Sequence, residues 1–486
     1  MERVFLGIDQ GSSSTKGVLL DMHGQHHQEF SVPVSTHIED GRIEQNPSEL
    51  LQSVRDIVDD AIRTAYRQKR QIAAIGLSTQ RSGVCAWARG SGEVLHPLIS
   101  HRDTRTRDRV ERIAEIGELI TQKTGLPLTA HYAGSKIALL QEEFPDPEVL
   151  IGTLDSYLVQ QFTGDVRFIT DDSMAARTLL YSLERAKWDP ELCSFWGVNA
   201  DRLPSIQPSL GQHGTYRGIP VRALLGDQQA GLFGRLAEGI KVVLNLGTIT
   251  SLCVCTGSEP QRANGFVSSV LYSAGEHERE HTYLLEAITS SSGALIDLLQ
   301  KKLEIASGIE QLHELCEKAK PDAAVAFLPL GGADTPAWRY DLPCLASAPI
   351  NERSPEFAKA AIEHIGFSIA NHIIGMRKSP GLLDGLTSIV VSGGLSDLNY
   401  LMQFIADVSE VELVRLSSRE GGARGAAIAA LTQTLGGKIS LPRDRAVRTF
   451  TPHPHKHSQR LNTWKKLREQ AWSGSFESSQ LVSLPA

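Results

Sequence analysis

The segment FLGIDQGSSSTKGVLLD, residues 5–21, joins an apolar run to an acidic residue, a glycine, a series of hydroxyls and a lysine. Gly11 and Lys16 have the spacing of a Walker A loop, in which backbone N–H groups at a helix N-terminus hold phosphate. The match is partial, because Ser14 and Thr15 stand where the second glycine should precede the lysine. Backbone N–H groups, hydroxyls and a lysine are still suitable donors for a phosphate group.

The residues after Lys16 predict a second strand and disfavour the Walker A arrangement. They read GVLLD, and the turn-like MHGQ follows them. A tight turn between two strands can hold phosphate through inward-pointing N–H groups. Asp9, at the end of the first strand, is then expected to face Mg²⁺ through a water molecule. A β-hairpin with a solvated turn explains this motif alone equally well. The expected phosphate-binding residues are Gly11, Ser12, Ser13, Ser14 and Lys16.

Two later segments repeat the combination of an apolar strand and a glycine turn. LNLGT, with Gly247 and Thr248, resembles the strand and turn of the opening segment. SGGLSDLN places Gly393 and Gly394 where a flat ring could lie against backbone without side chains. Three such turns favour a nucleotide held between two domains of one plan.

Length and composition predict a soluble two-domain protein with a small-molecule partner. A chain of 486 residues exceeds what one core usually supports. No apolar run approaches the roughly 18 residues of a membrane span. A net charge of −7 without a basic run argues against nucleic acid or a membrane surface as partner. Six cysteines without a CxxC pair, and an N-terminus without a secretory signal, indicate reduced thiols in the cytoplasm.

The pattern along the chain predicts alternating strands and helices. Residues 3–34 have the pattern of an antiparallel meander, and the apolar residues of 50–65 recur at helical spacing. A buried strand is expected at IAAIGLST, a hairpin at GVCAWARGSGEVLH and a charged helix from about Asp103 to Lys123. A second meander is expected from GIKVVLNLGTITSLCVCTG onward.

Three segments follow from this pattern. We expect an N-terminal domain at residues 1–228, a C-terminal domain at 229–437 and an appendage at 438–486. The appendage contains His453, His455 and His457, whose alternate spacing between prolines is more typical of an exposed loop than of a metal site.

The ordered set of motifs resembles the FGGY family of carbohydrate kinases, within the superfamily that includes actin, hexokinase and the heat-shock ATPases. The resemblance is carried by GIDQGSSSTKGVLLD and LNLGT as phosphate motifs, VVSGGLSDLNYLMQFIADV as the adenosine motif and GDQQAGLFG as the catalytic motif. TQRSG and HRDTRT resemble the glycerol kinase branch in particular. The similarity covers about residues 3–435.

The resemblance implies a fold and a reaction. The fold is α/β, with two domains of the ribonuclease H-like (actin-like ATPase) type, whose mixed sheets are flanked by helices and separated by a cleft. The reaction is phosphorylation of a hydroxyl of a small sugar or polyol, with ATP and Mg²⁺ as cofactors. Homodimers and homotetramers occur in the family. The ATP contacts implied beyond the first turn are Gly247, Thr248, Gly393, Gly394, Leu395 and Asn399.

The resemblance also places Asp227 of GDQQ as the catalytic base. An alcohol is a poor nucleophile, and a carboxylate within hydrogen-bond reach can orient it and take its proton. A carboxylate that caps the following helix is the alternative for Asp227, and a structural ion pair is the alternative for Arg81. The substrate contacts implied are Gln80, Arg81, His101, Asp103, His131 and Gln228.

Departures from the glycerol kinase pattern bear on the acceptor. Ser82 replaces the glutamate that follows the arginine, His131 stands at the position of a tyrosine, and His101 at that of a tryptophan. These changes weaken glycerol as the acceptor and favour a larger or more polar sugar or polyol. The competing functions are a catalytically silent sugar sensor and an actin-like or chaperone-like ATPase. The presence of both Asp9 and Asp227 argues against the sensor, and the tail is too short for a peptide-binding domain.

Overall fold

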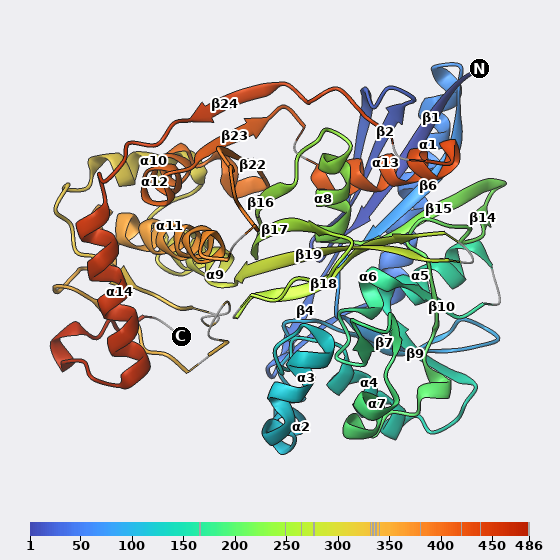
Figure 1. Ribbon diagram of the computed structural model, residues 1–486, viewed down its shortest axis with the longest axis horizontal. Coiled ribbons are helices and arrows are strands. Elements are labelled where there is room, and N and C mark those ends of the chain that lie inside the picture. Colours follow the sequence, from blue (N-terminus) through green and yellow to red (C-terminus); the bar gives the residue numbers. More distant parts are fainter. Residues whose placement is uncertain are drawn as a thin grey trace.

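A computed structural model describes residues 1–484 of the chain, apart from residues 165–166, 248, 264, 276–277, 331, 333–334, 336–337, 340, 380, 419 and 438. Two large mixed sheets are each flanked by helices, one carrying the N-terminal strands and the other lying toward the C-terminal helices (Figure 1). The expected two-domain α/β fold is confirmed. Within the described segments, no helix combines the length and the apolar character that crossing a membrane needs.

The first sheet contains the predicted N-terminal meander. Its strand order is β14-β15-β6-β1-β2-β3. Strand β2 is antiparallel to both β1 and β3, whereas β6 is parallel to β1 and to β15. Gln10 pairs with Thr15, so only a short turn joins β1 to β2. The strands are β1 (Glu2–Gln10), β2 (Ser14–Asp21), β3 (His26–Pro33), β6 (Arg70–Thr79), β14 (Thr215–Tyr216) and β15 (Ile219–Gly226).

The second sheet repeats this plan. Its order is β18-β19-β17-β16-β22-β23-β24, with β16 antiparallel to β17 and parallel to β22. The predicted structural echo between the two meanders is therefore confirmed, because each opens with an antiparallel hairpin and continues with parallel strands. The strands are β16 (Val242–Leu246), β17 (Thr250–Gly257), β18 (Val267–Ala274), β19 (Glu280–Thr289), β22 (Ser388–Ser392), β23 (Glu412–Leu416) and β24 (Ala446–Phe450).

A third, five-stranded sheet belongs to the N-terminal half. Its order is β4-β5-β8-β7-β9, and the predicted hairpin is present as the antiparallel pair β7 and β8. His101 follows β8, and His131 lies further along the segment that leads from β8 to β9. The strands are β4 (His37–Glu39), β5 (Arg42–Gln45), β7 (Val84–Ala88), β8 (Val94–Ile99) and β9 (Val149–Thr153).

Two predicted helices have different outcomes. Helix α1 (Pro47–Arg67) buries the apolar stripe that predicted it, and the side chain of Asn46 accepts a hydrogen bond from Ser48 N at its start. The single charged helix expected from Asp103 to Lys123 is wrong. The structure has α2 (Arg107–Arg112), a 3₁₀ turn and α3 (Gly117–Thr124) instead. The Asp103 carboxylate accepts a local hydrogen bond from Arg105 N, which competes with a helix, and a second hydrogen bond from the distant Ile43 N.

Helix α13 (Gly421–Leu435) connects the first sheet to the start of the second domain. It is rich in small residues and packs between the sheet and α8 (Asp227–Leu236) (Figure 1). A Cβ added to Gly7 or Gly76 would lie 1.9 Å from a carbonyl oxygen of α13, and one added to Gly425 would lie 1.8 Å from Ala230 O. These glycines are required because the backbones of the three elements touch.

Gly76→Ala is expected to lower the free energy of unfolding by about 1–3 kcal/mol, the usual cost of overpacking a core. The added methyl would meet backbone atoms of Ala426, which cannot rotate away. Urea unfolding measures the change. Gly90→Ala is the matched control, because nothing lies within 4 Å of a Cβ at that position. Equal stability of the two variants would contradict the close approach of α13.

The segment expected as an appendage contributes to the second domain. Strand β24 pairs with β23 at the sheet edge, and α14 (Ser458–Ser473) packs on α11 (Pro355–Arg377). Trp464 is buried among aromatic side chains, and its Nε1 donates a hydrogen bond to His364 Nδ1 at 3.1 Å. The sequence reading missed β24 because an exposed, polar edge strand carries little apolar signal.

The histidines of this tail contact an acidic residue of α12 (Asn399–Ser409). His453 Nδ1 lies 2.9 Å and Lys456 Nζ 3.3 Å from the Asp407 carboxylate, and His457 Nε2 lies 3.6 Å from it. Among the described residues they do not belong to a group with converging ligand atoms. Their contacts hold this segment against α12.

Candidate active site

The two domains enclose a cavity of about 300 Å³, lined by residues from both sheets and from α8 and α13. Most of the predicted site residues meet in it. Asp103, Leu395 and Asn399 are not among the residues that line it, and Thr248 lies outside the described residues. The predicted residues that line the cavity are Asp9, Gly11, Ser12, Ser13, Ser14, Lys16, Gln80, Arg81, His101, His131, Asp227, Gln228, Gly247, Gly393 and Gly394.

The first glycine turn is a β-hairpin. Gly11 N donates a hydrogen bond to Ser14 O at 3.0 Å, and β2 continues from Ser14 to Asp21. No helix follows Lys16, so the prediction of a hairpin in place of a Walker A loop is confirmed. Lys16 Nζ lies 2.8 Å from Glu420, the residue that precedes α13. Lys16 thus links the first turn to the start of α13 on the other side of the cavity.

Asp9 is an acidic group in a crowded position. Ser78 Oγ donates a hydrogen bond to Asp9 Oδ1 at 2.7 Å, and a Cβ on Gly422 would lie 2.3 Å from Asp9 Oδ2. Burial, and secondarily the nearby Asp227 carboxylate, raises the pKa of Asp9 to about 7. Two carboxylates in one cavity offer the oxygen ligands that a divalent cation such as Mg²⁺ prefers.

The raised pKa of Asp9 predicts a pH-dependent stability. The pKa increases from 3.8 to about 7 on folding, so between about pH 4 and pH 7 the unfolded chain loses this proton before the folded one. The free energy of unfolding of the ligand-free protein therefore decreases as the pH rises through this window. Asp9→Asn removes the titration, and its amide oxygen can still accept from Ser78. The difference in the free energy of unfolding, Asp9→Asn minus the original protein, should therefore be larger at pH 8 than at pH 4.5.

Urea unfolding at the two pH values measures this difference. Asp297→Asn, at an exposed position in the pair with Lys301 on α9 (Ser291–Asp297), is the control. The same stability difference between Asp9→Asn and the original protein at both pH values would contradict the prediction.

Asp227 is the first residue of α8 and follows directly on β15. Arg81 Nε lies 2.9 Å from Asp227 Oδ1, and Gln228 N donates a hydrogen bond to the same oxygen at 2.7 Å. The Gln228 amide is itself held by Asn245, whose Nδ2 donates to Gln228 Oε1 at 3.1 Å. The Asp227 side chain is 30% exposed, so it can reach a ligand in the cavity.

Arg81 takes part in a buried ion network that crosses between the domains. Its guanidinium donates to both carboxylate oxygens of Glu286, at 3.0 and 2.8 Å, and Glu286 lies on β19 of the second sheet. Arg177 Nη1 donates to Glu286 at 2.9 Å, and Ser251 Oγ donates at 2.7 Å. The two arginines, Arg81 first, lower the pKa of Glu286 to about 2 against the effect of burial. Arg81 therefore forms a structural ion pair with Glu286, which was the alternative considered for it, and also contacts Asp227.

The sequence reading missed Glu286 and Arg177. The available signal for Glu286 was a carboxylate in the apolar run YLLEAIT, since a charge in the middle of a buried strand requires a partner. Its partners lie 205 and 109 positions away, which local patterns do not show.

His101 and His131 form the other wall of this end of the cavity. Their rings lie 5.2 Å apart between centroids. Burial, and secondarily the surrounding cations Lys136, Arg102, Arg81 and Arg177, lowers the pKa of His101 to about 3. Burial also lowers the pKa of His131. Both rings are therefore neutral and can donate and accept hydrogen bonds.

The other predicted contacts have structural partners. Gln80 is buried, and its Nε2 donates to Gln45 Oε1 at 2.8 Å. Asp103 is bound to Arg105, and Asn399 Oδ1 accepts a hydrogen bond from Arg415 at 3.0 Å. Leu395 is buried in the core of the second domain. The contacts of Asp103 thus stabilise the loop that carries His101, outside the lining of the cavity.

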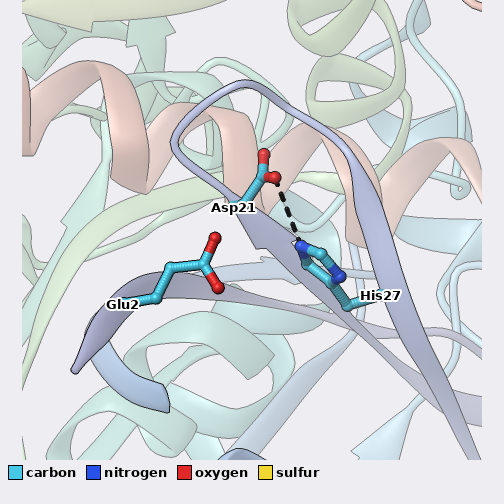
Figure 2. A group of neighbouring side chains, drawn as sticks. All are labelled: Glu2, Asp21 and His27. Carbon is cyan, nitrogen blue, oxygen red and sulfur yellow. Dashed lines mark ion pairs between the residues drawn. The ribbon is translucent and has the colours of Figure 1, made fainter. Parts of the chain in front are cut away.

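A second acidic group lies at the opposite end of β1 and β2. Glu2, Asp21 and His27 have ligand atoms within 4.8 Å of one another (Figure 2). Asp21 accepts hydrogen bonds from the backbone N–H groups of His23 and Gln25, at 2.8 and 2.9 Å, and lies 3.3 Å from His27. These bonds lower the pKa of Asp21 against the effect of burial. The group thus closes the turn between β2 and β3.

The repeated sheets, the three glycine turns and the carboxylate at the start of α8 define a two-domain phosphotransferase of the actin-like fold. Family models agree: the N-terminal domain of the FGGY family of carbohydrate kinases matches residues 4–234, and its C-terminal domain matches residues 242–434. The chain belongs to the FGGY family of carbohydrate kinases. It catalyses ATP-dependent phosphorylation of a sugar or polyol.

Named relatives cover almost the whole chain. A glycerol kinase of Methylobacterium nodulans is 31% identical over 448 residues, which is 88% of this chain and 89% of the relative. The crystal structure of Plasmodium falciparum glycerol kinase with ADP has a TM-score of 0.82 at 22% identity, covering 97% of this chain and 98% of that one. A ligand-bound xylulose kinase from Lactobacillus acidophilus has a TM-score of 0.79 at 20% identity, covering 97% of both chains.

Proposed function

We propose that the protein transfers the γ-phosphoryl group of Mg-ATP to a hydroxyl of a sugar or polyol larger or more polar than glycerol, with Asp227 as the general base. The observation that carries this proposal is the position of Asp227. It stands at the start of α8, in contact with Arg81, in the same cavity as the glycine turns at Gly11, Gly247 and Gly393. The proposed donor site and the proposed base therefore line one cavity.

The donor half rests on the backbone turns. The hairpin around Gly11 would hold phosphate through N–H groups and serine hydroxyls, and Gly393 and Gly394 would face the nucleoside. Asp9, which lines the cavity, would hold Mg²⁺ through a water molecule. When bound, Mg²⁺ supplies positive charge to the oxygens of the transferred group.

The acceptor half rests on Asp227 and Arg81. Asp227 would accept the proton of the attacking hydroxyl as the new P–O bond forms, and Arg81 would fix the orientation of the carboxylate. Gln228, held by Asn245, would contact a neighbouring hydroxyl. Closure of the two domains on ATP and the acceptor would exclude water, which would otherwise accept the phosphoryl group. The polar wall of His101 and His131 supports an acceptor with more hydroxyls than glycerol.

An ADP-release assay across candidate acceptors tests the proposal. Purified protein with Mg-ATP is offered tetroses, pentuloses, heptuloses, pentitols and glycerol. We expect one of the longer acceptors to exceed glycerol in kcat/KM. Uniform inactivity would support the sugar sensor instead, and ADP release that no acceptor stimulates would support the actin-like or chaperone-like ATPase.

A further inference from the structure

The charged groups of the cavity are almost completely paired. Four cationic side chains line it: Lys16, Arg81, Arg102 and Arg235. Lys16 lies 2.8 Å from Glu420, and Arg235 lies 3.0 Å from Glu238. Arg81 is bound to Asp227 and Glu286. Arg102 therefore differs from the other three.

Arg102 follows His101 in the loop after β8, and its side chain is exposed at the cavity. Its backbone N–H donates a hydrogen bond to Ser100 Oγ at 3.2 Å. Its guanidinium forms no hydrogen bond or ion pair within the part of the chain that the structure describes. The acceptor end thus presents a fork of donors and a positive charge without a protein partner.

The other cations near Arg102 do not share its lack of compensation. Arg81, Arg177 and Lys136 all lie close enough to His101 to disfavour its protonation. Glu286 and Asp227 pair with the two arginines, and burial lowers the pKa of Lys136 to about 7. Lys136 also donates hydrogen bonds to backbone carbonyls, including His131 O at 3.0 Å. A neutral sugar would therefore leave the charge of Arg102 uncompensated.

We propose that the acceptor is a polyhydroxy carboxylic acid whose carboxylate binds Arg102 while a hydroxyl at its other end reaches Asp227. The inference rests on the proposed kinase function. One guanidinium matches one carboxylate in charge and in fork geometry. A phosphate monoester carries about −1.5 to −2 charges at neutral pH and would need a second free cation.

Matched acceptors test the inference. The value of kcat/KM is measured for ribonate against ribitol and gluconate against glucitol, with ribose 5-phosphate as the phosphate-bearing alternative. We expect the better aldonate to exceed its alditol by about 10-fold, the size of a charge-assisted hydrogen bond at a partly solvated site. Arg102→Gln should reduce this ratio to about one without changing the KM for ATP, and Arg102→Lys should retain part of it. The control is Arg107→Gln, at an exposed arginine outside the cavity.

Several results would overturn the inference. In the original protein, these are a kcat/KM for the alditol equal to that for its aldonate, or a higher kcat/KM for ribose 5-phosphate. In Arg102→Gln, they are an equal loss of kcat/KM for aldonate and alditol, or a raised KM for ATP. Ligand-induced thermal shifts separate it from the kinase proposal. A shift with aldonate that Arg102→Gln abolishes, without turnover of any acceptor, would refute the kinase proposal and retain anion recognition. Turnover of neutral acceptors alone would retain the kinase proposal and refute anion recognition.

Discussion

Asp227→Asn is expected to lower kcat about 10²- to 10⁴-fold, the contribution of a positioned general base. Asparagine preserves the shape of the side chain, and its oxygen can still accept from Arg81 Nε and Gln228 N. It cannot take the proton of the attacking hydroxyl. The proposed ATP contacts lie on the glycine turns, so nucleotide affinity should remain. ADP release measures the rate, and titration calorimetry measures ATP binding.

The same variant separates catalysis from helix capping. Asparagine stabilises a helix start about as well as aspartate does, so a capping role would leave the rate intact. Asp297→Asn is the control for replacing an acidic residue elsewhere, since its side chain is 54% exposed and paired with Lys301. Activity retained in Asp227→Asn would contradict the assignment of the base.

Glu286→Gln is expected to lower the free energy of unfolding by about 3–5 kcal/mol, the usual cost of removing one partner of a buried ion pair. Arg177 and Glu286 are 0% exposed and Arg81 is 11% exposed, so neither arginine can recover its solvation. Urea unfolding measures the loss. We also expect a lower kcat, because Arg81 loses the bidentate contact that aims its Nε at Asp227.

An exposed pair gives the matched control. Glu314→Gln removes a carboxylate from the pair with Lys318 on α10 (Ile309–Lys318), where both side chains are more than 60% exposed. Such pairs contribute about 0–1 kcal/mol. A loss in Glu286→Gln no greater than in this control would show that the cross-domain network contributes little to stability.

The predictions that succeeded depend on neighbours in the chain. The turn at Gly11 is a hairpin because the residues after Lys16 favour a strand, and α1 follows from a helical apolar stripe. The similarity of the two meanders was visible because each contains a strand, a glycine turn and a second strand. Such local patterns specify secondary structure, because they reflect the backbone preference of each residue and the spacing at which buried apolar residues recur.

The predictions that failed depend on contacts between distant segments. The charged helix expected from Asp103 begins only at Arg107, because the Asp103 carboxylate accepts a hydrogen bond from Ile43, about sixty positions away. Strand β24 exists because β23 offers a free edge, although its own residues are mostly exposed. No local pattern reports either partner.

The sequence by itself determined the glycine turns between strands, because glycines and hydroxyls in such turns act through their own backbone. Only the tertiary structure decided the acceptor half. Glu286 from the second domain binds Arg81 and Arg177 of the first, whereas Arg102, beside the histidines, has no partner among the residues that the structure describes. Charge pairing in a cavity depends on distances of a few ångströms between residues far apart in the chain, which folding alone establishes.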